Sequence, residues 1–154
     1  MADSFVSLLQ GTARPTFVVA RETTWREFPL LWGSMLDEVY AVVKQAGPDG
    51  TPPGEDRWRN VMLYKDDVPN VEVGVLASGP FSGAGNVITS ALPAGATAVA
   101  THRGLYAGLD SAHRAIREWC ARHGHQLAGP RWEIYGHWRE DPSELETEVH
   151  YLLV

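Results

Sequence analysis

Apolar residues recur at three- and four-residue steps in two stretches of the chain, which is the spacing of one face of an α-helix. They are Phe28, Leu31, Trp32, Met35, Val39 and Val42 in the first stretch, and Leu105, Leu109, Ala112, Ile116 and Trp119, with Cys120 beside them, in the second. Both stretches run into glycine-containing segments, QAGPDG (45–50) and ARHGH (121–125), as a left-handed helix cap prefers. The pattern predicts two amphipathic helices.

Short β-rich runs come before and after each predicted helix. TFVVA (16–20) precedes the first helix and TAVAT (97–101) precedes the second. After the helices, residues 59–77 and 131–154 each contain two strand-like runs, joined by an acidic cluster with proline, DDVP or EDP. Such a cluster suits a hairpin connection. The chain therefore has the order strand–helix–strand–strand twice, which predicts an α+β fold.

The two halves also align with each other. Residues 16–35 can be laid on residues 97–116 at a constant offset, which pairs Thr16 with Thr97 and Phe28 with Leu109. We expect one domain over residues 1–154, with repeat 1 at about 12–80 and repeat 2 at about 94–154. SGPFSGAGNVITSALPAG (78–95) is interpreted as the linker between them. Neither half could bury its helix and sheet well alone, so a shared interior with a cleft between the halves is expected.

Length and charge limit the classes of partner. The chain has 154 residues, of which 44% are apolar and 21% charged, as in an ordinary globular domain. Its formal net charge of −6 argues against non-specific nucleic-acid binding, which needs a basic face. No run reaches the ~18 apolar residues of a membrane span, and the start lacks a secretory signal. We expect a cytoplasmic protein that binds neither nucleic acid nor membrane.

Cofactor and metal motifs are missing from the sequence. The glycine-rich GPFSGAG matches neither a Walker loop nor a GxSxG or GxGxxG motif. The histidines have no spacing that defines a set of metal ligands, and the single cysteine, Cys120, excludes a disulfide framework and a thiolate zinc site. We therefore expect no cofactor and no metal.

The segment GPRWEIY (129–135) places a glutamate in an apolar strand. Strand alternation puts Trp132 and Ile134 on one face, and Arg131, Glu133 and Tyr135 on the other. Glu133 is then either a solvated surface residue paired with Arg131 or a carboxylate inside an aromatic pocket, and alternation alone favours the surface. Two further acidic residues, Glu72 and Glu148, occupy equivalent strand positions in the two halves and are interpreted as surface residues.

Residues 96–154 resemble the GyrI-like small-molecule-binding family, which includes the effector-binding domains of AraC-type and MerR-type multidrug regulators. The resemblance rests on HRGLYAGL (102–109), GPRWEIY (129–135), the EDP turn (140–142) and the terminal TEVHYLLV (147–154), in this order. The first half matches the family's duplicated architecture more loosely, so the resemblance covers about residues 12–154. A helix-turn-helix domain does not precede the module, which implies the binding part of such a regulator without its DNA-binding part.

The resemblance implies two strand–helix–strand–strand modules related by a pseudo-twofold axis, with antiparallel sheets and a ligand cleft between the halves. It implies that Glu133 faces this cleft with Tyr135 beside it, and that the partner is a flat, hydrophobic, often cationic aromatic compound. The other candidate ligand-binding residues are Tyr106, Trp32, Met35, Tyr40, Tyr64 and Trp138.

Two functions are compatible with this site. One is a non-enzymatic binding protein that captures or senses such a compound, using Glu133 for charge and aromatic faces for stacking. The other is a cofactor-independent hydrolase, since some members that resemble this chain in lacking a DNA-binding domain open the activated cyclopropane of DNA-alkylating natural products. In that reaction Glu133 would activate water, while Tyr135 or Tyr106 would hydrogen-bond to the departing phenolate. The sequence favours binding.

Overall fold

The structure is a computed structural model that describes residues 5–45, 58–77, 83–137 and 139–154. The described chain is α+β, as predicted, with eight strands, two α-helices and two short 3₁₀ turns. The first half contains β1 (Ser7–Gly11), β2 (Arg14–Glu22), α1 (Phe28–Gln45), β3 (Asn60–Tyr64) and β4 (Asn70–Leu76). The second half contains β5 (Ile88–Leu92), β6 (Gly95–Arg103), η2 (Tyr106–Gly108), α2 (Leu109–His123), β7 (Leu127–Tyr135), η3 (Pro142–Glu144) and β8 (Glu146–Leu153).

The eight strands form one antiparallel sheet in the order β1-β6-β8-β7-β3-β4-β2-β5. The expected sheets of the two halves are continuous because β3 pairs directly with β7, with Val61 opposite Ile134 and Tyr64 opposite Arg131. The predicted order strand–helix–strand–strand occurs twice, as β2-α1-β3-β4 and β6-α2-β7-β8. Whether the halves arose by duplication stays a prediction.

Two strands lie where none was predicted. β1 precedes the first predicted run, and β5 lies within the segment interpreted as a linker. Both cover edges of the opposite half of the molecule, since β1 pairs with β6 and β5 pairs with β2. Most of their side chains are exposed, which explains why the hydrophobic pattern did not reveal them.

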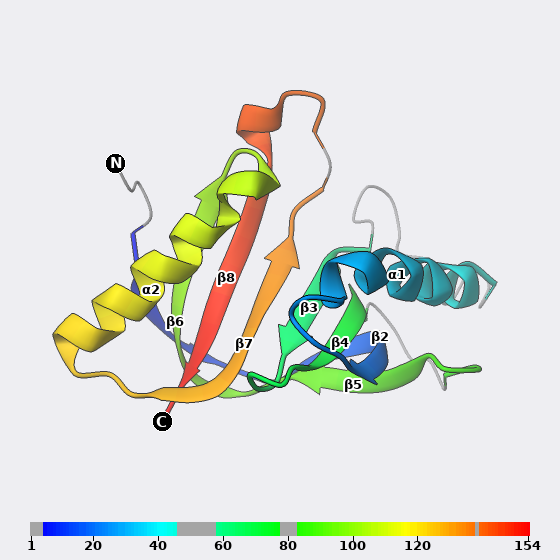
Figure 1. Ribbon diagram of the computed structural model, residues 1–154, viewed down its shortest axis with the longest axis horizontal. Helices are drawn as coiled ribbons and strands as arrows, with labels where there is room; N and C mark the ends of the chain where they lie inside the picture. The colour runs from blue at the N-terminus through cyan, green and yellow to red at the C-terminus, as the bar shows by residue number, and fades with distance from the viewer. Residues whose placement is uncertain (1–4, 46–57, 78–82, 138) are drawn as a thin grey trace.

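The two helices lie on the same face of a strongly curled sheet, each above the strands of its own half (Figure 1). Helix α1 starts after Thr24, whose hydroxyl accepts a hydrogen bond from the Glu27 backbone N–H at 3.1 Å. Helix α2 ends at Gly124, whose φ of 73° is left-handed and whose N–H bonds to the Cys120 carbonyl. This is the glycine cap that ARHGH predicted.

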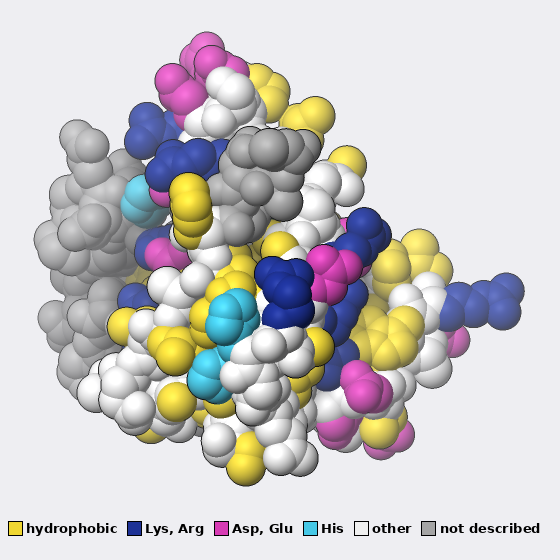
Figure 2. All heavy atoms as spheres, turned by 90° about the vertical axis from the view of Figure 1, so that its left-hand side faces the viewer, with side chains coloured by type: hydrophobic (Ala, Val, Ile, Leu, Met, Phe, Trp, Pro, Cys, Tyr) yellow, Lys and Arg dark blue, Asp and Glu magenta, His cyan; other side chains and the backbone are white. Residues whose placement is uncertain are grey.

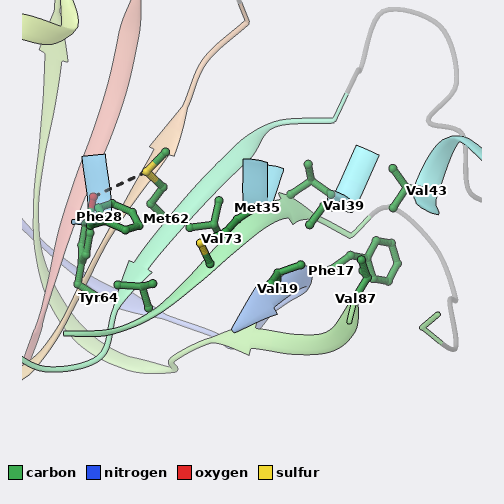
Figure 3. Packing of buried hydrophobic residues seen from close by; sticks show 12 residues of the cluster. Phe17, Val19, Phe28, Met35, Val39, Val43, Met62, Tyr64, Val73 and Val87 are labelled. Atoms are coloured by element: carbon green, nitrogen blue, oxygen red, sulfur yellow. Dashed lines mark hydrogen bonds between the residues drawn. The ribbon is translucent and has the colours of Figure 1, made fainter. Parts of the chain in front are cut away.

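Three apolar clusters hold the sheet and helices together. Beneath α1, the buried residues of the helix pack on those of β2, β3 and β4, and Figure 3 shows Phe28, Met35 and Val39 facing this layer. Beneath α2, Leu109, Ala112, Ile116 and Cys120 pack on β6 and β8. The third cluster lies on the opposite face of the sheet and includes Val61, Trp132 and Ile134. The sheet is therefore covered by apolar contacts on both faces near its centre.

Figure 2 shows the face that lies on the left of Figure 1, at the side of β1 and the end of α2. Basic (lysine or arginine), acidic and histidine side chains are interspersed there with apolar ones. This face therefore carries both signs of charge. Neither helix in the described part of the chain is long and apolar enough to cross a membrane.

Candidate functional site

Strand β7 places Glu133 on the face of the sheet that the helices cover. Trp132 and Ile134, the residues on either side, are buried in the apolar cluster of the opposite face, as the alternation predicted. The surface interpretation of Glu133 is wrong, because only 5% of the residue is exposed. Its expected partner Arg131 pairs instead with Asp67, at 2.8 Å.

Both carboxylate oxygens of Glu133 have hydrogen-bond partners. The Oε1 atom accepts bonds from the hydroxyls of Tyr135, at 2.6 Å, and Tyr64, at 3.1 Å. The Oε2 atom lies 2.6 Å from Nε2 of His113, on α2. The partners come from β3, β7 and α2, so the carboxylate joins both halves of the molecule. A buried carboxylate needs such partners to offset its lost hydration.

The interaction with His113 continues toward the surface. Nδ1 of His113 lies 2.7 Å from the Tyr151 hydroxyl, which accepts a 3.0 Å bond from the Arg117 guanidinium. Every group has a partner if Arg117 donates to Tyr151, Tyr151 donates to Nδ1 of His113, and Nε2–H donates to Glu133. In this arrangement the imidazole is neutral, so it does not cancel the negative charge of Glu133.

The two tyrosines bonded to Glu133 act as donors over the ordinary pH range. Burial, followed by the nearby Glu133 charge, raises the pKa of both Tyr64 and Tyr135 far above the usual tyrosine value. Their hydroxyl protons therefore stay in place and point to Oε1. The site holds one carboxylate that accepts hydrogen bonds from two un-ionised tyrosine hydroxyls.

A cleft of about 440 Å³ opens beside this carboxylate. Its lining comes from both halves of the chain, with Phe28, Trp32 and Tyr64 from the first half and Tyr106, Glu133 and Tyr135 from the second. The ring of Tyr106 meets that of Tyr135 edge to face, with centroids 5.5 Å apart. Leu36, Met62 and Leu109 add apolar surface. The cleft thus combines aromatic walls with one acidic group.

The structure brings most of the predicted site residues to this cleft. Glu133, Tyr135, Tyr64, Tyr106 and Trp32 line it, and Trp32 and Tyr106 are 40% and 44% exposed.

Three candidates lie elsewhere or outside the described chain. Met35 is 2% exposed and packs in the core beneath α1, because its position on the helix faces the sheet whereas Trp32 faces the cleft. Tyr40 is not part of the cleft lining. Its hydroxyl donates a 2.6 Å hydrogen bond to Oδ1 of Asn60, and Asn60 lines the cleft. Trp138 lies outside the described residues.

The two other strand glutamates are not free surface residues. Glu72 is buried, and its carboxylate pairs with Nζ of Lys65 at 2.6 Å and accepts a 2.7 Å bond from Ser90. Glu148 is half-buried and pairs with Arg59 and His150. The surface interpretation of Glu72 is therefore wrong, because only 4% of the residue is exposed. Both glutamates have cationic or hydroxyl partners and lie outside the cleft lining.

Sequence analysis missed His113, Tyr151 and Arg117. The signal in the sequence was weak: His113 and Arg117 stand four residues apart on α2, beside the apolar stripe of Leu109 and Ile116, and so share one side of the helix. Nothing in the pattern indicated that Tyr151 of β8 would meet them. Among the described residues, no cluster of histidine, cysteine or acidic side chains is arranged to hold a metal ion.

An α+β domain with a partly enclosed cleft between its two halves is the architecture of a small-molecule-binding domain. The chain belongs to the family of GyrI-like small molecule binding domains, whose model matches residues 6–151. None of the curated proteins compared with the chain matches it.

Solved structures share the fold. The C-terminal domain of EcmrR is 20% identical, with a TM-score of 0.78 and 99% of each chain covered. SAV2435, solved bound to tetraphenylphosphonium, is 9% identical with a TM-score of 0.64, over 99% of this chain and 94% of its own. A hydrolase from Listeria innocua is 9% identical with a TM-score of 0.59, over 97% and 91%. At these identities the likeness is one of fold.

Proposed function

We propose that this chain captures a flat, hydrophobic, cationic small molecule in the cleft beside Glu133. The observation that carries the proposal is a carboxylate that is 5% exposed, adjoins an aromatic cleft and has no lysine or arginine partner among the described residues. A buried negative charge without a cationic partner is complementary to a ligand that brings the positive charge.

The hydrogen bonds of Glu133 favour a delocalised cation. Its two oxygens already accept bonds from Tyr64 and Tyr135 and meet His113, so a ligand gains little by offering another donor. A quaternary or ring-delocalised cation needs no acceptor and responds to the charge itself. Aromatic faces stabilise such cations further, by about 0.5–2 kcal/mol for a cation–π contact.

The size and walls of the cleft support a rigid aromatic ligand. Its volume of about 440 Å³ falls in the range of roughly 300–1,000 Å³ of small-molecule pockets. The exposed rings of Trp32 and Tyr106 stand at the cleft from opposite halves of the chain, so a flat molecule could contact both. The tetraphenylphosphonium bound to SAV2435 is a cation of this hydrophobic kind on a shared fold.

The hydrolase alternative is not favoured by the same geometry. A general base needs a lone pair directed at the attacking water. In Glu133 the two tyrosine hydroxyls take both lone pairs of Oε1, and His113 takes one of the two on Oε2. Donors that stabilise a carboxylate also make it a weaker base. Glu133 is therefore better suited to holding a positive charge than to taking a proton from water.

Calorimetric titration with tetraphenylphosphonium and with tetraphenylborate, an anion of nearly the same shape, tests the proposal. We expect the cation to bind and the anion to bind at least ten times more weakly. Glu133→Gln keeps the shape of the side chain and removes the charge. Its amide oxygen can still accept from Tyr64 and Tyr135, while its NH₂ group faces Nε2 of His113, and affinity for the cation should fall by about tenfold or more. Glu144→Gln, at an exposed glutamate, is the matched control.

Equal binding of the two ions, or no effect of Glu133→Gln, would contradict the proposal. A second measurement addresses the enzyme directly. The protein is incubated with a cyclopropane-bearing alkylator and the products are followed by mass spectrometry. Repeated turnover by the wild type that Glu133→Gln abolishes would favour the hydrolase instead.

A further inference from the structure

A second cavity adjoins Glu133 on the side away from Tyr135. It has a volume of about 300 Å³ and is lined by Trp25, Tyr64, His113, Arg117, Arg131 and Tyr151, among others. Tyr64, Leu109 and Glu133 belong to the lining of both cavities. These three residues therefore lie where the aromatic cleft adjoins a second, more polar space.

The walls of the second cavity are held in place by contacts of their own. The Arg131 guanidinium lies over the Trp25 ring, 5.3 Å from its centroid, and pairs with Asp67. The Trp25 ring in turn lies 5.5 Å from that of Tyr64. Trp25 is also fixed by the bond from its indole N–H to the Asp67 carbonyl, at 3.0 Å. This side of the cavity presents a flat aromatic surface and a guanidinium that is paired with an exposed aspartate.

The opposite wall presents a cation that is not neutralised. Arg117 donates to the uncharged Tyr151 hydroxyl and forms no ion pair with any carboxylate in the described part of the chain. The one other carboxylate of this cavity, on Asp110, is paired with Arg114. Arg117, at an exposed position of α2, therefore lacks an acidic partner among the described residues, and the buried Glu133 lacks a lysine or arginine partner there.

These two groups are joined through the side chains of Tyr151 and His113. The path runs from Arg117 through Tyr151 and His113 to Glu133, over contacts of 3.0, 2.7 and 2.6 Å. The bridge keeps the charges apart, since Tyr151 and His113 stand between them. A ligand that carries a positive and a negative group on one aromatic frame could neutralise both.

We propose that the cavity beside Arg117 is a second subsite, which receives an anionic group such as a carboxylate on the cationic aromatic ligand held at Glu133. The inference rests on the proposed function and narrows the ligand class to zwitterionic aromatic compounds. Arg117 selects the anionic group through a charge-assisted hydrogen bond, and the Trp25 face supports the ring that carries it.

Rhodamine B and its ethyl ester provide a matched pair of probes. They share one xanthylium cation, but the carboxylate of rhodamine B is blocked in the ester. Fluorescence anisotropy titrations should show that the wild type binds rhodamine B more tightly than the ester. Arg117→Gln should lower the affinity for rhodamine B by about fivefold and the affinity for the ester by less than twofold. Arg117→Lys should restore part of the difference, because it restores the charge. Arg122→Gln, at an exposed arginine in the last turn of the same helix and outside the lining of the cavity, is the control and should change neither dye.

The outcomes separate this inference from the proposed function. If Arg117→Gln acted indirectly, by altering Glu133 through Tyr151 and His113, it would lower the affinity for both dyes equally, because both carry the same cation. An equal loss for the two dyes, or no loss for rhodamine B, would overturn the second subsite and leave cation binding at Glu133 intact. If Glu133→Gln left the affinities for both dyes unchanged, the proposed function would fail. The effect of Arg117→Gln on the affinity for rhodamine B could still be measured. Absence of binding of both dyes to the wild type would overturn both proposals.

Discussion

His113 on α2 and Glu133 on β7 meet at 2.6 Å, so a polar contact fastens the helix of the second half to the centre of the sheet. Helix α2 also packs on the sheet through apolar residues, and His113 and Arg117 contact the Tyr151 hydroxyl of β8. This pair is also where the neutral path from Arg117 reaches the buried carboxylate.

Replacing His113 with alanine should destabilise the fold. Oε2 of Glu133 would lose its partner while staying buried, and an unsatisfied buried acceptor costs about 1–3 kcal/mol. Urea unfolding followed by far-UV circular dichroism measures the change, and His137→Ala, at an exposed histidine, is the control. In the background of Glu133→Gln the same substitution should cost less, since no charge is stranded. An equal cost in both backgrounds would show that the contact does not depend on the carboxylate.

The tyrosines should titrate at unusually high pH. Burial raises the pKa of four of the five tyrosines, Tyr40, Tyr64, Tyr135 and Tyr151, with Glu133 adding to the shift at all but Tyr40. Above pH ~10 the unfolded chain loses these protons while the folded chain keeps them, so stability is intact below that pH and falls as pH rises. Absorbance at 295 nm should therefore rise mainly together with unfolding. Full ionisation of a still-folded protein near pH 10 would contradict the buried donor arrangement.

Acid should lower the stability of the fold through Glu148, which lies with His150 and Trp132 on the face of the sheet opposite the helices. The hydrogen bond with His150 lowers the pKa of Glu148, against the opposing effect of burial and with help from Arg59. A lowered folded-state pKa adds stability above the ordinary glutamate pKa of about 4.3, and this stability is lost as pH falls below it. We expect Glu148→Gln to flatten the decline in melting temperature between about pH 5 and 3. A parallel decline in the variant and the wild type would count against the pairing.

Two glycine-to-alanine substitutions should have opposite effects. A Cβ at Gly74 would lie 1.9 Å from the Phe17 carbonyl oxygen and 2.8 Å from Val18 Cα, so β4 could not stay against β2. Gly33 in α1 has nothing within 4 Å of such a Cβ. Gly74→Ala should cost on the order of 3 kcal/mol or abolish folding, whereas Gly33→Ala should add roughly 0.5–1 kcal/mol because alanine favours helix. Thermal unfolding compares both; a folded Gly74→Ala protein of normal stability would refute the close approach of the strands.

Much of the fold followed from residue periodicity. The three- and four-residue spacing located both helices, and alternation correctly separated Glu133 and Tyr135 from Trp132 and Ile134. Alternation does not say which face of a strand meets the cleft, and taken alone it favoured the surface for Glu133. The resemblance to the GyrI-like family directed that face inward.

The parts that escaped prediction depend on contacts between distant segments. His113 and Tyr151 stand 38 residues apart, and only the pairing of β7 with β8 and the packing of α2 bring them together. Met35 and Trp32 share one predicted stripe, yet a single helical turn separates a core position from a cleft position. Side-chain direction at the edge of a stripe depends on how the helix is rotated against the sheet, which periodicity does not define.

The crossed positions of β1 and β5 have a consequence for how the chain can be divided. The edge strand of each half is supplied by the other, since β1 precedes β2 but pairs with β6, and β5 precedes β6 but pairs with β2. A cut between β4 and β5 would produce two fragments, each with an uncovered edge that only the other fragment can fill. Such fragments should fold poorly apart and reassemble when mixed. Because the cleft is lined by residues of both fragments, recovery of ligand binding would then measure their reassembly.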